Sequence, residues 1–141
     1  MRTYIRTLLL FCSAVLLQAC TASLIQKTAE FENKHWLVQS FDYNDIANAD
    51  GKIYIEFNRS EKTIKGFGGC NHILGSYSLT GSDITIKPVR SKENCPGTIE
   101  VENRFMQLLE KAIEFREITS SDKDYLRLIT KDGSSIELRK K

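Results

Sequence analysis

Several residue types are scarce in this chain, and the scarcity limits its chemistry. The 141 residues include two histidines, two prolines and one tryptophan, with no internal repeat or low-complexity segment. The length suits one domain and is too short for a barrel-type α/β enzyme or a two-domain ligand clamp. Basic and acidic residues nearly balance at 20 and 18, which argues against disorder and against a nucleic-acid-binding tail.

No apolar run is long enough to cross a bilayer, but the N-terminus predicts export. Arg2 and Arg6 precede an apolar stretch, Thr7–Leu17, of about 11 residues, whereas a membrane-spanning helix needs roughly 20. The stretch ends in Leu-Gln-Ala-Cys, and this order resembles a bacterial lipobox with Cys20 as its cysteine. The resemblance implies cleavage after Ala19 and a lipid on Cys20, so that acyl chains hold the protein at the membrane. The alternative is an ordinary secreted protein with a chance cysteine at the cleavage point.

These signals divide the chain into three parts. We expect a lipoprotein signal peptide over residues 1–19, a lipidated cysteine and tether over 20–33, and a folded domain over 34–141. Thr21 stands where an Asp would retain a lipoprotein in the inner membrane, so an outer-membrane location facing the periplasm is favoured. Arg2 and Arg6 account for the whole formal charge of +2, and that charge therefore indicates nothing about an acidic partner.

The domain is mainly β by pattern. Apolar and polar residues alternate with a period of two in most segments, which predicts short strands separated by turns. The expected strands are His35–Tyr43, Lys52–Phe57, Thr63–Gly68, His72–Leu79, Asp83–Val89 and two that flank the Asp132-Gly133 turn, with Glu114–Thr119 as an eighth candidate.

One segment has the period of a helix. Apolar residues share one face from Val101 to Ile113, and this spacing predicts a helix over about Ile99–Ala112 that packs through Phe105 and Leu109. Thr98 is the expected N-cap. Glu100 and Glu102 are interpreted as carboxylates near the positive end of the helix dipole rather than as an acid/base pair. The sequence thus predicts a sheet of seven or eight strands with one packed helix.

A glycine-rich motif lies between two of the expected strands. Glycines at 66, 68 and 69 permit positive φ and close backbone approach, so they predict a bulge or corner in a curved sheet. Asn71 follows and can bond neighbouring backbone groups. Gly75 and Tyr77 share a face of the next strand, where the glycine makes room for an aromatic ring or a crossing backbone. A ligand-facing corner is the functional interpretation, and barrel closure is the structural one that we favour.

Two cysteines remain in the domain, Cys70 and Cys95. They are either buried thiols that pack as small apolar groups, a disulfide, or two ligands of a metal site shared with His72. An oxidising compartment favours the disulfide. A fourth metal ligand is missing, so no metal site is expected.

The segment G-F-G-G-C-N-H-I-L-G-S-Y (residues 66–77), with Cys95 and the helix after it, resembles the META domain of HslJ-like bacterial lipoproteins. The resemblance covers about Lys34–Leu138 and departs from the family only before Cys95, where the usual Thr is absent. It implies a small antiparallel β-barrel-like domain with one helix. It also implies that the protein belongs to the bacterial envelope and is linked to heat shock and antibiotic tolerance. It implies no established catalytic activity. The family motif residues it transfers are Gly66, Gly69, Asn71, Gly75 and Tyr77.

Nothing in the sequence indicates catalysis. His35 adjoins Trp36 at a strand start and is interpreted as a packing or surface residue. Ser76 and Ser78 lack a nucleophile-elbow context, and the glycine cluster lies between two strands rather than before a helix. We therefore expect neither catalytic residues nor a cofactor.

The first functional hypothesis is a monomeric, non-enzymatic envelope lipoprotein that serves stress tolerance by binding a protein or small molecule. Its partners would be the membrane, through Cys20, and an unidentified envelope ligand, but not nucleic acid. The alternative is a barrel-type inhibitor of a host lysozyme that inserts Ser91-Lys92-Glu93 into the enzyme's cleft. An enzyme is the third and least favoured hypothesis.

Overall fold

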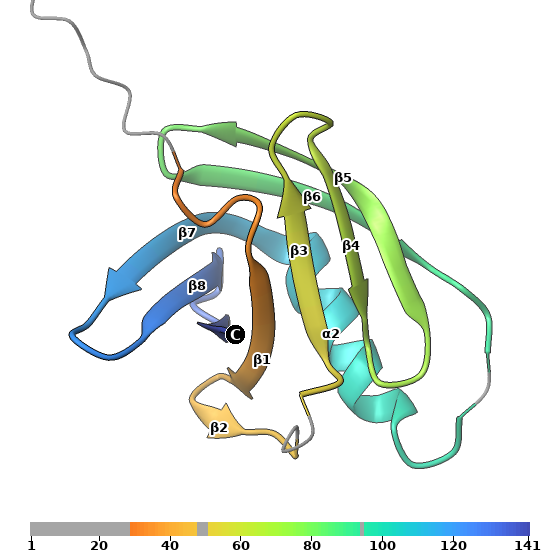
Figure 1. Cartoon of the computed structure of the whole chain (residues 1–141). Coiled ribbons are helices and arrows are strands. Elements are labelled where there is room, and N and C mark those ends of the chain that lie inside the picture. The colour runs from red at the N-terminus through yellow and green to blue at the C-terminus, as the bar shows by residue number, and fades with distance from the viewer. Residues whose placement is uncertain (1–28, 48–50, 94) are drawn as a thin grey trace, which may run out of the picture.

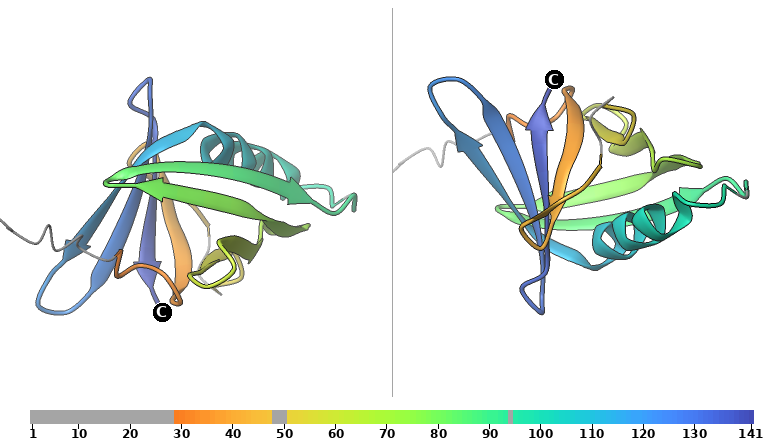
Figure 2. Two further views of the ribbon diagram at one scale, coloured as in Figure 1. Left: turned by 90° about the horizontal axis from the view of Figure 1, so that it is seen from above. Right: turned by 90° about the horizontal axis from the view of Figure 1, so that it is seen from below.

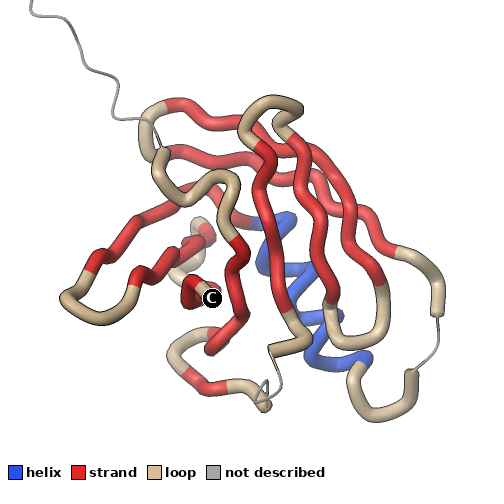
Figure 3. Tube along the Cα trace, in the orientation of Figure 1, coloured by secondary structure: helices blue, strands red, loops and turns tan. Residues whose placement is uncertain are grey.

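The computed structural model describes residues 29–47, 51–93 and 95–141. In this part of the chain nine strands and one helix are present (Figures 1 and 3). The elements in chain order are β1 (His35–Phe41), β2 (Asn44–Asp45), β3 (Tyr54–Asn58), β4 (Thr63–Phe67), β5 (His72–Thr80), β6 (Asp83–Arg90), α2 (Ile99–Lys111), β7 (Ala112–Thr119), β8 (Asp124–Thr130) and β9 (Ser135–Lys140). The expected signal peptide, Cys20 and the tether up to residue 28 lie outside the described residues.

Eight of these strands form a closed antiparallel barrel. The sheet runs in the order β1-β3-β4-β5-β6-β7-β8-β9, and β1 pairs with β9 as well as with β3, which closes the ring. The two-residue strand β2 is an addition beside the end of β1. The predicted fold class, a small antiparallel barrel with one helix, is confirmed.

The junction between β6 and β7 is the sparsest in the barrel. Only Asp83 and Glu114 pair there, with one further bond from the Phe115 amide to the Ser82 carbonyl (3.0 Å). Helix α2 packs along β6, as Figure 2 shows from two sides, and it also contacts β8 and β9. It therefore closes the barrel where the two strands diverge.

The core follows the predicted alternation. In β3, Ile55 and Phe57 are fully buried while Tyr54 and Glu56 face outward. Phe105 and Leu109 of α2 are also fully buried, as the helical spacing predicts. The core cluster comprises Phe31, Trp36, Val38, Phe41, Ile53, Ile55, Phe57, Ile64, Ile73, Tyr77, Ile84, Ile86, Phe105, Leu108, Leu109, Ala112, Leu126, Leu128, Ile136 and Leu138.

Two predicted boundaries differ from the structure. The first strand ends at Phe41, because Asp42 and Tyr43 adopt positive φ (51° and 65°) and turn the chain. The helix ends at Lys111 and passes directly into β7, so Ile113, expected on the apolar helix face, is 48% exposed in the strand.

The predicted N-cap interaction is also absent. Thr98 precedes the helix, but its side chain caps no helical N–H group. Its hydroxyl instead lies 3.5 Å from the Cys95 carbonyl oxygen.

The domain begins earlier than predicted. Phe31, assigned by pattern to the tether over 20–33, has no exposed surface, and its ring packs against Phe57 and Phe115 at 4.9 and 4.8 Å. The indole of Trp36 donates to the Phe31 carbonyl (2.8 Å), and Glu117 accepts from the Phe31 amide (2.6 Å). The residues just before β1 are therefore part of the barrel and not of a tether.

Candidate functional site

The glycine motif forms a corner that receives a carboxylate from the helix. β4 ends at Phe67, and the chain turns through Gly68 and Gly69 (φ +107°) before β5 begins. A Cβ atom on Gly68 would lie 2.5 Å from Cγ of Glu102. The glycine therefore makes room for a side chain from α2, which is more specific than the general corner that the sequence predicts.

Glu102 is completely buried and fully hydrogen-bonded. One carboxylate oxygen accepts from the backbone amides of Cys70 (3.2 Å) and Asn71 (2.6 Å). The other accepts from the Asn71 side-chain NH₂ (2.7 Å) and from the Arg90 guanidinium (2.8 Å). Burial alone would raise the pKa of Glu102, but the bonds from Asn71, Cys70 and Arg90 outweigh it and hold the pKa below its ordinary value.

Asn71 extends this network to the segment after β6. Its side-chain oxygen accepts from the Ser91 hydroxyl (3.0 Å) and the Glu93 amide (2.7 Å). Its NH₂ group also reaches the Glu93 carbonyl at 3.3 Å. Asn71 thus ties three segments together, and it is itself only 1% exposed.

Cys70 and Cys95 form a disulfide, with Cα atoms 5.7 Å apart. The bond joins the glycine corner to the segment that leads into α2, as predicted. Both sulfurs are engaged, so the alternative of a metal site with His72 has lost two of its three ligands. Among the described residues no group of three or more His, Cys, Asp or Glu side chains is placed to hold a metal ion.

The remaining motif glycines allow strands to approach. A Cβ atom on Gly66 would lie 2.4 Å from the Tyr54 carbonyl oxygen, and one on Gly75 would lie 2.2 Å from that of Lys87. The backbone beside Gly75 is that of its paired neighbour β6, where Pro88 is its register partner, so the glycine makes room for an adjacent strand rather than for an aromatic ring or a crossing segment. Barrel closure, rather than a ligand, explains both positions.

Tyr77 joins a second buried polar cluster around Glu32. The Tyr77 hydroxyl donates to Glu32 and to the Asn58 carbonyl, and Glu32 also accepts from Arg59 (2.8 Å) and Lys62 (2.5 Å). Burial and the Glu32 carboxylate raise the pKa of Tyr77 above its ordinary value. Burial raises the pKa of Glu32, but the bonds from Lys62, Tyr77 and Arg59 have the larger effect, so its pKa lies below the ordinary value. This cluster fixes the residues before β1 to the β3–β4 turn.

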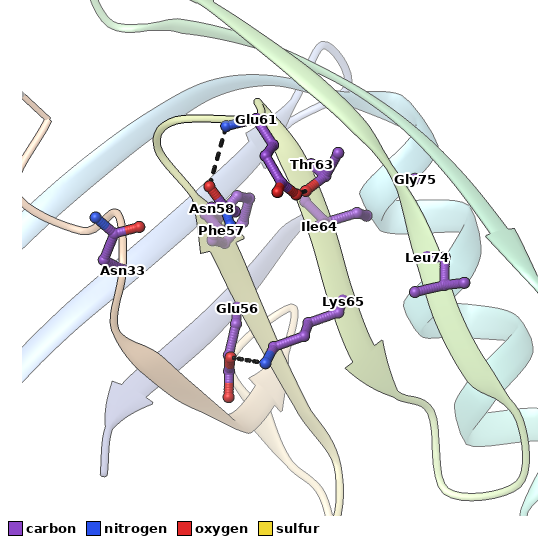
Figure 4. Close-up of a pocket in the computed structure, with 10 residues that line it drawn as sticks. All are labelled: Asn33, Glu56, Phe57, Asn58, Glu61, Thr63, Ile64, Lys65, Leu74 and Gly75. Atoms are coloured by element: carbon purple, nitrogen blue, oxygen red, sulfur yellow. Dashed lines mark hydrogen bonds and ion pairs between the residues drawn. The ribbon is translucent and has the colours of Figure 1, made fainter.

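A groove of about 500 Å³ lies over β3, β4 and β5 (Figure 4). It is lined by Asn33, Glu56, Phe57, Asn58, Glu61, Thr63, Ile64, Lys65, Leu74 and Gly75. Its volume is in the range of small-molecule sites, about 300–1,000 Å³. The sequence did not single out this groove, because its residues come from four separate segments.

An ion-pair network lies along one side of the groove. Glu56 accepts from His35 Nδ1 (2.6 Å) and from Lys65 Nζ (2.9 Å). Burial raises the pKa of Glu56, but the bonds from His35 and Lys65 more than offset this and lower it; the same carboxylate raises the pKa of Lys65. His35, interpreted from sequence as a packing or surface residue, thus has a charged partner.

Two asparagines of the groove are held by their oxygens. The Asn33 side-chain oxygen accepts from the Arg59 amide (3.0 Å), and that of Asn58 accepts from the Ser60 and Glu61 amides (both 3.0 Å). Because backbone N–H groups are donors only, these bonds identify which end of each amide is oxygen. Within the described part of the chain, neither NH₂ group has a hydrogen-bond partner.

An aromatic row borders the groove on the same outer face. The ring of His35 stacks on Tyr54 (4.4 Å between centroids), and that of His72 contacts Phe67 (5.4 Å). Tyr54 and Phe67 are direct partners in the β3–β4 register. The four rings therefore form a band across β1, β3, β4 and β5.

Comparison with known proteins assigns this fold to a family. The META domain family model matches residues 29–141. The chain belongs to the META domain family. The match begins at Ala29 and so includes Phe31 and Glu32, which the structure also packs into the barrel.

Two solved structures have the same fold as this META domain. A protein from Burkholderia xenovorans, solved by NMR, is similar with a TM-score of 0.66 and 17% identity, over 79% of this chain and 83% of that one. A DUF4847 family protein from Bacteroides vulgatus, known from a crystal structure, is similar with a TM-score of 0.60 and 17% identity, over 78% and 94%. A search of curated proteins finds no significant match. In the described residues no helix is long and apolar enough to cross a membrane.

Proposed function

We propose that this META domain is a lipid-anchored protein of the bacterial envelope, on the outer membrane and facing the periplasm. We propose further that it acts in stress tolerance by binding a ligand at the groove over β3–β5, without catalysing a reaction. The order Leu-Gln-Ala-Cys up to Cys20 supports the anchor. The resemblance to HslJ-like lipoproteins supports the envelope location and the link to heat shock and antibiotic tolerance.

The observation that carries the binding proposal is that the polar side chains of the glycine motif already bond to one another inside the protein. Glu102 accepts four hydrogen bonds, and Asn71 donates or accepts at every side-chain atom that can do so. A carboxylate closed off in this way has no exposed surface with which to meet a substrate. The groove, by contrast, has amide, carboxylate, ammonium and aliphatic groups on an accessible outer face.

The anchor is tested by acylation. Radiolabelled palmitate fed to cells should appear on the wild-type protein and not on Cys20→Ser. Label that persists on the variant would overturn the lipobox assignment. Label missing from the wild type would overturn the anchor altogether.

The groove is tested by capture from envelope extracts of heat- or antibiotic-stressed cells. Lys65→Glu reverses the charge beside Glu56 and should lose the material that the wild type retains. Lys87→Glu is the matched control, because Lys87 is an exposed residue of β6 outside the groove. Equal capture by all three proteins would contradict the proposal.

The inhibitor alternative requires Ser91-Lys92-Glu93 to enter an enzyme's cleft, but two of these three residues are held by Asn71. The Ser91 hydroxyl donates to Asn71, and the Glu93 backbone is bonded to the same side chain, so of the three residues only Lys92 has no interaction with Asn71. A lysozyme assay separates the two functions directly. Inhibition at micromolar protein would favour the alternative over the proposal made here.

A further inference from the structure

We propose that the ligand of the groove is a neutral oligosaccharide, in an inference that rests on the proposed binding role of the groove. Four features of the groove limit the chemistry of its occupant: the donors that it offers, its charge, its apolar border, and the strand pairing beneath it.

The groove offers oriented donors. The oxygens of Asn33 and Asn58 are fixed by backbone amides, so each NH₂ group has a set orientation, and neither has a protein partner in the described residues. An ordered donor costs little further entropy on binding. A ligand rich in hydroxyl or carbonyl oxygens would satisfy both groups.

The charge of the groove argues against anions. Among its lining residues Glu56 and Glu61 are acidic and only Lys65 is basic, and Lys65 is paired with Glu56. Glu61 accepts from the Thr63 hydroxyl at 3.3 Å and otherwise faces solvent. An exposed carboxylate accepts hydrogen bonds from hydroxyl groups but repels phosphates and carboxylates. A ligand that presents hydroxyl groups is therefore complementary to the groove, and an anion is not.

The border of the groove offers apolar contact. Leu74 lines it and is 59% exposed, and its register partner Val89 on β6 is 61% exposed. Tyr54 and Phe67, one row away from Glu56 and Lys65, extend this surface with two rings. A sugar ring has apolar C–H faces and a hydroxylated rim, so it matches a surface where aliphatic and aromatic groups adjoin amides and carboxylates.

The strand pairing argues against an extended peptide. Peptides that add to a sheet need a free strand edge. β4 is bonded to β3 on one side and to β5 on the other over all five of its residues. The occupant must therefore bind through side chains on the face of the sheet, as an oligosaccharide would.

The test is an NMR titration of the ¹⁵N-labelled full chain in detergent with three tetrasaccharides. Tetra-N-acetylchitotetraose and cellotetraose are neutral, and tetragalacturonate is the anionic counterpart. We expect a neutral sugar to shift the side-chain NH₂ signals of Asn33 and Asn58 and the amides of 63–65. Tetragalacturonate should bind at least about 10-fold more weakly than the better neutral sugar.

Variants isolate the donors. Asn58→Asp and Asn33→Asp keep the oxygens that accept from the backbone and replace each NH₂ donor with a carboxylate oxygen that can only accept, so each should weaken neutral-sugar binding about 3- to 10-fold where the NH₂ group donates to the sugar. Asn103→Asp is the matched control, because the Asn103 oxygen accepts from Arg90 (2.7 Å) and the residue lies on α2, outside the groove. A dispersed spectrum verifies that each variant is folded.

The outcomes are distinguishable. Absence of shifts in the groove at 20 mM of each neutral sugar would overturn the oligosaccharide inference, as would tighter binding of the anionic sugar or unchanged affinity in both Asn→Asp variants. None of these results bears on the capture experiment with Lys65→Glu. The proposed binding function would then be tested by that comparison alone.

Discussion

Glu102 occupies the space that a side chain on Gly68 would take, with only 2.5 Å between an ideal Cβ there and Glu102 Cγ. The two residues are 34 positions apart, one in the corner after β4 and one in the first turns of α2. The corner therefore leaves space for a side chain of the helix. This relationship explains why small residues, a cysteine and an asparagine stand together in the motif.

Loss of the carboxylate should destabilise the protein strongly. Glu102→Ala leaves the Cys70 and Asn71 amides without their acceptor and leaves the Arg90 guanidinium with Asn103 alone. We expect the free energy of unfolding to fall by about 3–5 kcal/mol, because removing one member of a buried charged network strands the others. Urea unfolding measures the change.

The matched control is Glu100→Ala, an exposed carboxylate in the same helical turn. It should cost no more than about 0.5 kcal/mol, as is usual for surface substitutions. Similar losses in the two variants would show that burial of Glu102 has no energetic consequence.

Acid should destabilise the fold through its buried carboxylates. Glu102 and Glu32 both have pKa values lowered from 4.5 in the folded state. The unfolded chain therefore binds protons first as pH falls, so the contribution of these groups is complete above about pH 5.5 and is lost progressively below 4.5. Tm measured from pH 7 to 3 should stay level and then decrease.

A variant identifies the responsible group in that titration. Glu102→Gln should have a lower Tm at pH 7 and a smaller decrease between pH 5 and 3 than the wild type. If the two curves remain parallel throughout, Glu102 does not contribute to the acid sensitivity.

Reduction of the Cys70–Cys95 disulfide should lower stability. The bond closes a loop with a sequence separation of 25. In the chain-entropy model such a loop contributes about 3.5 kcal/mol. Intact mass with and without reductant checks that the bond is present, and urea unfolding of Cys70→Ser with Cys95→Ser gives its contribution. An unchanged mass on reduction would contradict the bond itself.

Phe31 should behave as a core residue and not as part of a tether. Its side chain is fully buried between Phe57 and Phe115, so Phe31→Ala should cost about 3–5 kcal/mol in urea unfolding. Tyr43→Ala serves as the control, because Tyr43 is 73% exposed and its removal should have a small effect. A loss below about 1 kcal/mol for Phe31→Ala would restore the longer tether that the sequence suggests.

The sequence predicts the strands and the helix well, because alternation and helical spacing are local properties. It also predicts the disulfide, since only two cysteines follow Cys20 and the expected export of the protein would favour their oxidation. Phe31 was missed because a single aromatic between Glu30 and Glu32 has no period. Its burial depends on contacts with β3 and β7, which lie far along the chain.

The site was harder to predict than the fold. Near the start of a helix, the pattern alone does not separate a buried Glu102 from an exposed carboxylate that interacts with the helix dipole. The one signal for burial was that Glu102 lies on the apolar face of the helix in a chain that also has a glycine corner. The groove gave no signal, because Asn33 reaches the β3–β4 hairpin of Asn58 and Lys65 only through tertiary packing. Nonlocal contacts of this kind cannot be inferred from periodicity.

The central claim is that the motif is a structural clasp between the glycine corner and α2. A double-mutant cycle of Gly68→Ala and Glu102→Ala, measured by urea unfolding, tests it most directly. Gly68→Ala alone should cost about 1–3 kcal/mol through overpacking against Glu102. In the Glu102→Ala background, where the space is vacant, it should cost much less, giving a coupling of about 1 kcal/mol or more. Additive losses would contradict the clasp and return the motif to consideration as a ligand site.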